Sequence, residues 1–154
     1  EHTDIVTHWL GSIVVKYTCE SSVPVWCAVG DVNGGPQFTY VSRDDFRIVF
    51  GALTGNGQYT LKDRKNIPYT TFLTPPLSRV GLTEEDAINQ GYTVKTKEML
   101  VATMPTTHVK DYLKGAFKIA VDADNDLILG VWLSSQCAEA SINLIKMAMN
   151  NNSP

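Results

Sequence analysis

The sequence predicts an α+β fold, in which an antiparallel sheet flanked by helices follows a shorter N-terminal part. Two alternating apolar segments, residues 117–121 and 127–133, are typical of the strands of a β-hairpin joined by an acidic turn. Residues 138–150 carry apolar side chains at helical spacing and predict a closing helix. A polar connection separates this C-terminal part, residues 63–154, from residues 1–62.

The N-terminal part has two predicted strands. A short apolar run at residues 25–29 is bounded by Pro24 and Gly30, as expected of a buried strand. A further strand is predicted at residues 12–16.

A helix is predicted to follow the turn at residues 33–36. It is expected to begin near Thr39 or Ser42 and to run from about residue 42 to residue 50. The segment from Ser42 to Asp45 has the pattern of a capping box, with acidic side chains where the helix dipole favours them.

The C-terminal part alternates predicted strands and helices before its hairpin. The expected elements are a strand at residues 69–73, a break at Pro75 and Pro76, a helix capped by Thr83 that runs to Gln90 with Gly91 at its C-cap, a strand at residues 92–100 and an irregular stretch at residues 104–111.

The closing helix has two apolar stripes. The first consists of Ala138, Ile142, Ile145 and Met149, and the second begins with Leu144 and Ala148. One stripe can face the sheet of its own domain. The second needs another cover, either further core or a subunit interface.

Composition excludes several classes of partner. The formal net charge is -3 and the pI is near 5.5, and the basic residues are scattered, so no nucleic-acid partner is expected. No apolar run approaches the length of a membrane span, so no membrane partner is expected. Three cysteines without C-x-x-C spacing indicate reduced thiols in a cytoplasm.

Two clusters resemble metal sites only in part. Residues 122–126 begin like an EF-hand calcium loop but lack its glycine and its closing glutamate, so a polar hairpin turn is favoured. Cys19 and Cys27, taken with His2 or His8, match no tetrahedral zinc spacing. Cys27 is instead expected to be a small apolar side chain inside a strand, and no metal site is predicted.

Asp31 is the strongest candidate for a ligand-binding residue. A carboxylate at the end of a strand can accept two hydrogen bonds from a polyhydroxylated chain, and Gly30 lets the backbone approach a ligand closely. The helix start near Thr39 would direct free N–H groups and a positive dipole end at that ligand. The simpler alternatives are that Asp31 is only a turn residue and that the Thr39 hydroxyl only caps the helix.

Residues 23–40, V-P-V-W-C-A-V-G-D-V-N-G-G-P-Q-F-T-Y, resemble the second FAD-binding motif of the pyridine nucleotide-disulfide oxidoreductases. The resemblance implies that Asp31 holds the ribityl hydroxyls of FAD, with Gly30 beside it. It also implies that the backbone N–H groups of Gln37, Phe38 and Thr39 lie near flavin N1 and O2.

A second motif, at residues 65–87, resembles the opening of the same family's C-terminal dimerisation domain. An Ile-Pro, a Phe-x-x-Pro and a V-G-L-T-E-x-x-A recur there in this order. Leu77 follows Pro76, where most members have an acidic residue, and the wording is most similar to the reactive-chlorine-resistance, hypothiocyanous acid reductase-like branch. The resemblance implies that residues 1–62 are a remnant of the FAD-binding domain, and that residues 63–154 are a dimerisation domain forming a homodimer.

Several parts of such an enzyme do not occur in this sequence. It has no G-x-G-x-x-G, no C-x-x-x-x-C pair, no second nucleotide-binding domain and no His-Pro…Glu segment. The resemblance therefore implies the C-terminal portion of an FAD-dependent NAD(P)H:disulfide or oxidant oxidoreductase, inactive alone and binding FAD weakly or not at all. The alternative is a free-standing dimerisation or scaffold module without flavin or catalysis.

Overall fold

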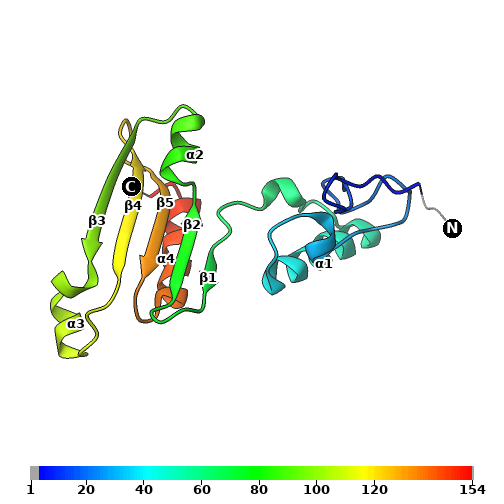
Figure 1. The fold of residues 1–154 in the computed structure, drawn as a ribbon. Helices are drawn as coiled ribbons and strands as arrows, with labels where there is room; N and C mark the ends of the chain where they lie inside the picture. The colour runs from blue at the N-terminus through cyan, green and yellow to red at the C-terminus, as the bar shows by residue number, and fades with distance from the viewer. Residues whose placement is uncertain (1–3, 154) are drawn as a thin grey trace. The chain divides into compact units, whose positions relative to one another are not determined.

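The computed structural model describes residues 4–153, which form two compact units divided between Lys65 and Asn66. Unit 1 is the N-terminal unit and unit 2 the C-terminal one, and Figure 1 labels their helices and strands. No helix among the described residues is long and apolar enough to cross a membrane.

Unit 1 is built around one long helix. It contains the 3-10 helix η1 (Gly30–Asn33), the α-helix α1 (Thr39–Thr54) and the 3-10 helix η2 (Leu61–Asp63). The described residues before η1 form turns and two isolated β-bridges, Thr7 with Ile13 and Glu20 with Cys27.

The strands predicted at residues 12–16 and 25–29 are not formed. Each segment makes a single bridge, and Val25 has a φ of 71°, in the left-handed region that strands exclude. Val25 is also 83% exposed, so the apolar run is not a buried one. A strand is stable only when it pairs along its length with a neighbour, and neither segment has such a neighbour among the described residues.

The helix predicted in unit 1 is formed; of its two expected starts, Thr39 is confirmed and Ser42 is wrong, and the helix runs past residue 50 to Thr54. α1 begins at Thr39 and has Phe38, in an extended conformation, at its N-cap. Ser42 and Asp45 therefore lie inside the helix and do not form a capping box. Asp45 is buried and bonds to groups outside its own helix. The three-residue spacing from Ser42 to Asp45 therefore resembles a capping box without forming one. Gly55, with a φ of 80°, ends the helix as a left-handed C-cap.

Unit 2 is a five-stranded antiparallel sheet with helices. The strands are β1 (Tyr69–Thr71), β2 (Leu77–Gly81), β3 (Val94–Leu100), β4 (Ala116–Asp122) and β5 (Ile128–Ser134), in the spatial order β1-β2-β5-β4-β3. The helices are α2 (Glu84–Asn89), α3 (Pro105–Val109) and α4 (Ala138–Asn150), with the 3-10 helix η3 (Val101–Thr103) before α3. α4 lies along one face of the sheet (Figure 1).

Most predicted elements of unit 2 are confirmed. The hairpin is the β4–β5 pair, and α4 has the predicted bounds. Thr83 caps α2, because its side chain accepts a hydrogen bond from the N–H of Asp86 at 2.8 Å. Three elements were missed: β2, the 3-10 helix η3, and the short helix α3 in the stretch predicted to be irregular.

The core of unit 2 lies between α4 and the central strands. From the sheet it takes Val80 of β2 together with Val131 and Leu133 of β5, and from α4 it takes the first apolar stripe. The strands approach closely beside this core. A Cβ on Gly130 would lie 2.0 Å from the carbonyl oxygen of Leu82, so only glycine fits at that position.

Truncation of Ile142, which is 2% exposed, is expected to destabilise unit 2 strongly. Ile142→Ala should lower the free energy of unfolding by about 2–5 kcal/mol, because it removes buried methyl groups and leaves a cavity. Urea unfolding followed by circular dichroism measures the change. The neighbouring exposed Ser141 supplies the control, since Ser141→Ala should stay within about 0.5 kcal/mol of the parent. Equal effects of the two substitutions would contradict the assigned core.

Candidate functional site

The five predicted cofactor-binding residues lie on one short stretch of unit 1. Gly30 and Asp31 are the first two residues of η1, Gln37 and Phe38 directly precede α1, and Thr39 is its first residue. Glycines with left-handed backbones shape this stretch. The φ of Gly30 is 72°, and a Cβ on it would lie 2.9 Å from Oγ of Ser42 in α1.

The Asp31 carboxylate is exposed and has no hydrogen-bond or ion-pair partner among residues 4–153. Its main chain is fixed, because the N–H of Gly34 donates to the Asp31 carbonyl at 3.2 Å. The carboxylate can therefore accept hydrogen bonds from hydroxyl groups of a ligand without first losing an internal partner.

The N-terminus of α1 has no side-chain cap. The N–H of Phe38 is already used, since it donates to the Pro36 carbonyl at 3.0 Å. The N–H groups of Gln37 and Thr39 have no acceptor among the described residues. A helix start of this kind presents donors and a positive dipole end to a carbonyl or an anionic ring edge. Of the three predicted N–H donors, two are therefore unoccupied.

An ionic cluster in unit 1, which was not predicted from the sequence, holds this stretch against α1. Asp45, which is 1% exposed, forms an ion pair with the guanidinium of Arg64, whose Nε also donates to Asp44 at 2.7 Å. Tyr59 donates to Asp44 at 3.2 Å. The only sequence feature that indicated this cluster is the pair of adjacent aspartates in the predicted helix. Their partner, Arg64, lies about twenty residues further along the chain.

The pKa values of this cluster follow from burial and charge. Burial acts to lower the pKa of Arg64, but hydrogen bonds to Asp45 and Asp44 outweigh it and place that pKa above its usual range. Burial and the nearby charge of Asp44 raise the pKa of Tyr59. Arg64 therefore stays charged and Tyr59 neutral under all ordinary conditions.

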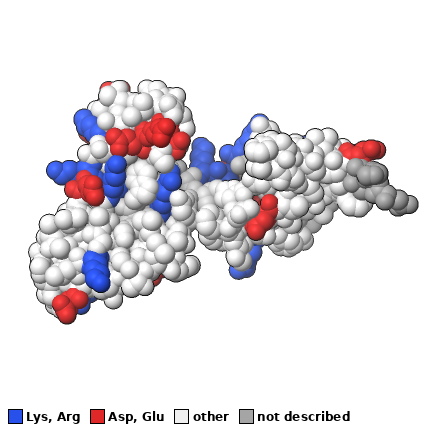
Figure 2. Space-filling model, in the orientation of Figure 1, with Lys and Arg blue, Asp and Glu red and all other residues white. Residues whose placement is uncertain are grey.

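In unit 2, one row of side chains crosses all five strands on the sheet face opposite α4. Tyr69, Arg79, Trp132, Lys118 and Glu98 are successive partners in the register. The Arg79 guanidinium lies 5.2 Å from the centre of the Trp132 ring, a cation–π arrangement. On the face of unit 2 that Figure 2 shows, acidic side chains gather in one group with basic side chains beside it, and most of the remaining surface is uncharged.

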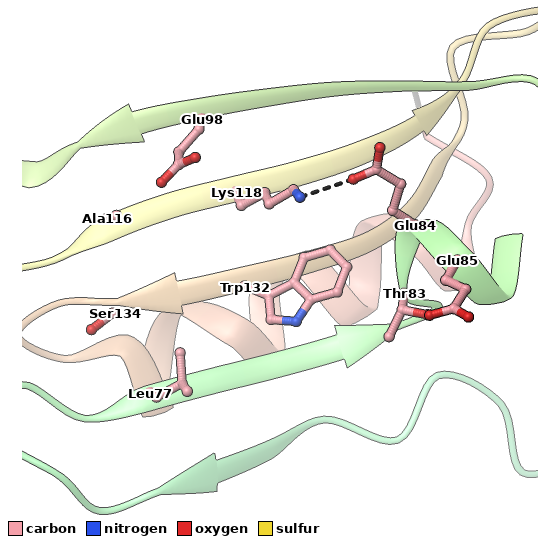
Figure 3. Close-up of a pocket in the computed structure, with 9 residues that line it drawn as sticks. All are labelled: Leu77, Thr83, Glu84, Glu85, Glu98, Ala116, Lys118, Trp132 and Ser134. Atoms are coloured by element: carbon pink, nitrogen blue, oxygen red, sulfur yellow. Dashed lines mark hydrogen bonds and ion pairs between the residues drawn. The ribbon is translucent and has the colours of Figure 1, made fainter. Parts of the chain in front are cut away.

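A shallow pocket of about 470 Å³ opens on the same face around Trp132 (Figure 3). Lys118 and Glu84 form an ion pair in it, with 2.9 Å between Nζ and Oε2. The pocket is lined by Leu77, Thr83, Glu84, Glu85, Glu98, Ala116, Lys118, Trp132 and Ser134. None of these lining residues forms a hydrogen bond between a nucleophile and a base.

The outer side of α4 carries exposed apolar side chains among polar ones. Leu144 is 68% exposed and Met147 is 61% exposed, while Ala148 beside them is half-buried. The first stripe faces the sheet as predicted, with Ile145 packed against the core. We call Leu144, Met147 and Ala148 the outer stripe of α4. Met147 was not part of the second stripe predicted from the sequence.

The residues considered as metal ligands are not gathered into a site. Among residues 4–153, no group of three or more His, Cys, Asp or Glu side chains could hold a metal ion. The Asp122 carboxylate instead accepts hydrogen bonds from the N–H of Asp124 and the side chain of Asn125, as in a polar hairpin turn. His2 lies outside the described residues.

Comparison with known proteins gives concordant matches. The sequence profile of the pyridine nucleotide-disulphide oxidoreductase dimerisation domain matches residues 67–154. Along its whole length the chain is 40% identical to the probable pyridine nucleotide-disulfide oxidoreductase RclA of Escherichia coli (strain K12), of which it covers 35%. It is 36% identical to a mercuric reductase of Lysinibacillus sphaericus over 122 residues, which are 79% of this chain and 22% of the reductase.

Solved structures agree with these matches. The HOCl-induced flavoprotein disulfide reductase RclA from Escherichia coli aligns with a TM-score of 0.88 and 40% identity, over 97% of this chain and 34% of that one. The chain thus spans about a third of the length of RclA.

The three cysteines are free thiols in different settings. Cys19 is fully buried, and burial, followed by the charge of Asp45, raises its pKa to about 11. Cys27 and Cys137 are exposed. The expectation that Cys27 is a buried apolar side chain is wrong, because the strand that would have buried it is not formed.

These settings predict two classes of thiol reactivity. In the isolated chain at pH 8, a chromogenic thiol reagent should modify Cys27 and Cys137 rapidly. Cys19 should react only after denaturation, because it is covered and only about one in a thousand of its thiols would be ionised. The Cys27→Ser/Cys137→Ser double variant should show no rapid phase. Three rapid equivalents in the parent would show that Cys19 is accessible.

Proposed function

Because this chain belongs to the pyridine nucleotide-disulphide oxidoreductase family, we propose that it is the C-terminal portion of an FAD-dependent NAD(P)H:disulfide or oxidant oxidoreductase. The observation that carries the proposal is that similarity to RclA extends through both units, and so includes the stretch from Gly30 to Thr39. The chain then has two tasks in the whole enzyme: unit 1 supplies the second half of the flavin site, and unit 2 supplies the homodimer interface.

The residues of unit 1 fit one end of a flavin. The Asp31 carboxylate, which has no partner among the described residues, suits the ribityl hydroxyls, and Gly30 before it lets the backbone pass close to Ser42 of α1. The unoccupied N–H groups of Gln37 and Thr39, at the uncapped start of α1, suit the pyrimidine edge of the ring. Phe38 contributes less than predicted, because its N–H is already bonded to Pro36.

FAD, when bound, takes up hydride from NAD(P)H and passes electrons on to a disulfide or an oxidant. The task of this chain is electrostatic. Donors and a helix dipole directed at N1 and O2 favour negative charge there, and Asp31 orients the ring through the ribityl chain. The pyrophosphate requires a glycine-rich turn at a helix N-terminus, which does not occur in this sequence. The isolated chain is therefore expected to be inactive and to bind FAD weakly or not at all.

Unit 2 is proposed to form the homodimer through the outer stripe of α4. A two-fold axis beside α4 would bring the outer stripes of two copies together and remove their apolar surface from water. Neither nucleic acid nor a membrane is proposed as a partner. The three unpaired thiols support a reducing, cytoplasmic setting.

The role of Asp31 can be tested in the whole reductase. Asp31→Ala should weaken FAD binding about 10- to 150-fold, because it removes charge-assisted hydrogen bonds of about 1.5–3 kcal/mol. Asp31→Asn keeps the shape and some of the acceptor capacity, so it should cost less. Flavin retention on dilution, followed by fluorescence, measures both. The exposed turn residue Asp124 gives the control, because Asp124→Ala should retain FAD. Full retention by Asp31→Ala would leave Asp31 as a turn residue only.

The proposed interface predicts a homodimer of the chain at tens of micromolar, a concentration at which an interface of standard size holds. Leu144→Asp should give monomers by light scattering with unchanged circular dichroism, because Leu144 is 68% exposed and supports no core. Ile88→Asp places the same charge on an exposed aliphatic position of α2 and should leave the dimer intact. Monomeric parent protein, or a dimer that survives Leu144→Asp, would contradict this interface.

A further inference from the structure

The carboxylate of Asp45 reaches from α1 to a backbone N–H before Asp31 and to a side-chain amide after it. Its Oδ2 atom accepts a hydrogen bond from the N–H of Gly30 at 2.8 Å and another from Nδ2 of Asn33 at 2.9 Å. Gly30 directly precedes Asp31, and Asn33 follows it by two residues. One buried oxygen atom therefore holds both ends of η1, while the Asp31 side chain itself is left without a partner among the described residues.

Asn33 extends this fixation along the loop. Its Nδ2 also donates to the carbonyl of Ala28 at 3.3 Å, and its Oδ1 accepts from the N–H of Gly35 at 3.0 Å. Hydrogen bonds to Asp45 and Asn33 thus fix main-chain groups before and after Asp31. The direction in which the Asp31 side chain leaves the backbone is consequently set by the Asp45 carboxylate.

Burying the charged Asp45 carboxylate costs free energy, and filling space in the core would not require a charged residue. Asp45 is 1% exposed, and a buried carboxylate is tolerated only with a charged partner and satisfied acceptors. Arg64, with a side chain only 11% exposed, supplies the positive charge at the other oxygen, Oδ1. An apolar residue could fill the same volume, but it could not hold the Gly30 N–H and the Asn33 amide.

We propose that Asp45, held by Arg64, is a positioning residue for the flavin site, which fixes the Gly30–Asn33 backbone so that the Asp31 carboxylate faces the ribityl chain. The inference rests on the proposed function, because Asp45 makes no contact with FAD in it and acts only through Asp31. Asp44 offers a natural comparison: it bonds to the same arginine but has no hydrogen bond to the Gly30–Asn33 backbone.

The test is a double-mutant cycle on FAD affinity in the whole reductase, with Asp31→Ala, Asp45→Asn and the combined variant. Asp45→Asn keeps the size of the side chain but removes the charge that serves Gly30 and Asn33, so the FAD dissociation constant should rise about tenfold. If Asp45 acts through Asp31, the combined variant should bind FAD no more weakly than Asp31→Ala alone, within about twofold. The bound-flavin absorption spectrum should shift in the same way in all three variants.

The control is Asp44→Asn, which removes the charge of the other carboxylate bound by Arg64 without touching the loop. It should leave the FAD dissociation constant within about twofold of the parent, even if urea shows a loss of stability. Asn33→Ala is a second route to the same loop that leaves the Asp45–Arg64 pair in place. It keeps the test available should Asp45→Asn fold poorly, and it should also show no further loss when combined with Asp31→Ala.

Each outcome separates this inference from the proposed function. Losses that multiply in the combined variant would mean that Asp45 stabilises unit 1 generally, and would overturn the positioning role while leaving Asp31 as a flavin ligand. Unchanged FAD affinity in both Asp45→Asn and Asn33→Ala would likewise overturn the positioning role and leave Asp31 as a flavin ligand. An equal loss in Asp44→Asn would also overturn it. Retention of FAD by Asp31→Ala would remove the proposed flavin contact itself, and the inference with it.

Discussion

The apolar layer between α4 and strands β2 and β5 is the contact on which unit 2 depends. A sheet with one covered face must put its other face in water or against a partner, and α4 is the helix that packs against the central strands. Two surfaces are left over as a direct result: the row of charged and aromatic side chains on the far face of the sheet, and the outer stripe of α4. The candidate interface and the shallow pocket of unit 2 both lie on these remaining surfaces.

Local sequence signals predicted unit 2 well where local contacts decide the structure. The β4–β5 hairpin and α4 were visible because alternation and helical spacing persist over seven or more residues in each. β2 was missed because Leu77–Gly81 is short and carries a serine, an arginine and a glycine. Pairing with β1 on one side and with β5, far along the chain, on the other makes this segment a strand. The family resemblance, in contrast, rested on motif wording and is confirmed by the comparisons.

In unit 1 the motif at residues 23–40 indicated the candidate site, but it did not indicate the Asp45–Arg64 pair that holds this site in place. The sequence placed Gly30, Asp31 and the residues before α1 close together because they are neighbours along the chain. It could not reveal that Asp45 turns inward, since its ionic partner Arg64 follows nineteen residues later and no periodicity links them. The strand predicted at residues 25–29 failed for the same physical reason, because a strand is defined by its neighbours and not by its own apolar content.

The strand order of unit 2 also governs how the unit assembles. Residue 81 of β2 pairs with residue 130 of β5, so the ordered pairing of these strands must wait until β3, β4 and the segments between them exist. During synthesis, the β1–β2 pair is complete long before its partner strand leaves the ribosome, and one edge of β2 is unpaired in that interval. The brevity of β2 and the charge of Arg79 limit incorrect pairing at that edge. The shortness and polar content that kept this strand out of the sequence-based prediction also make its unpaired edge a poor template for aggregation.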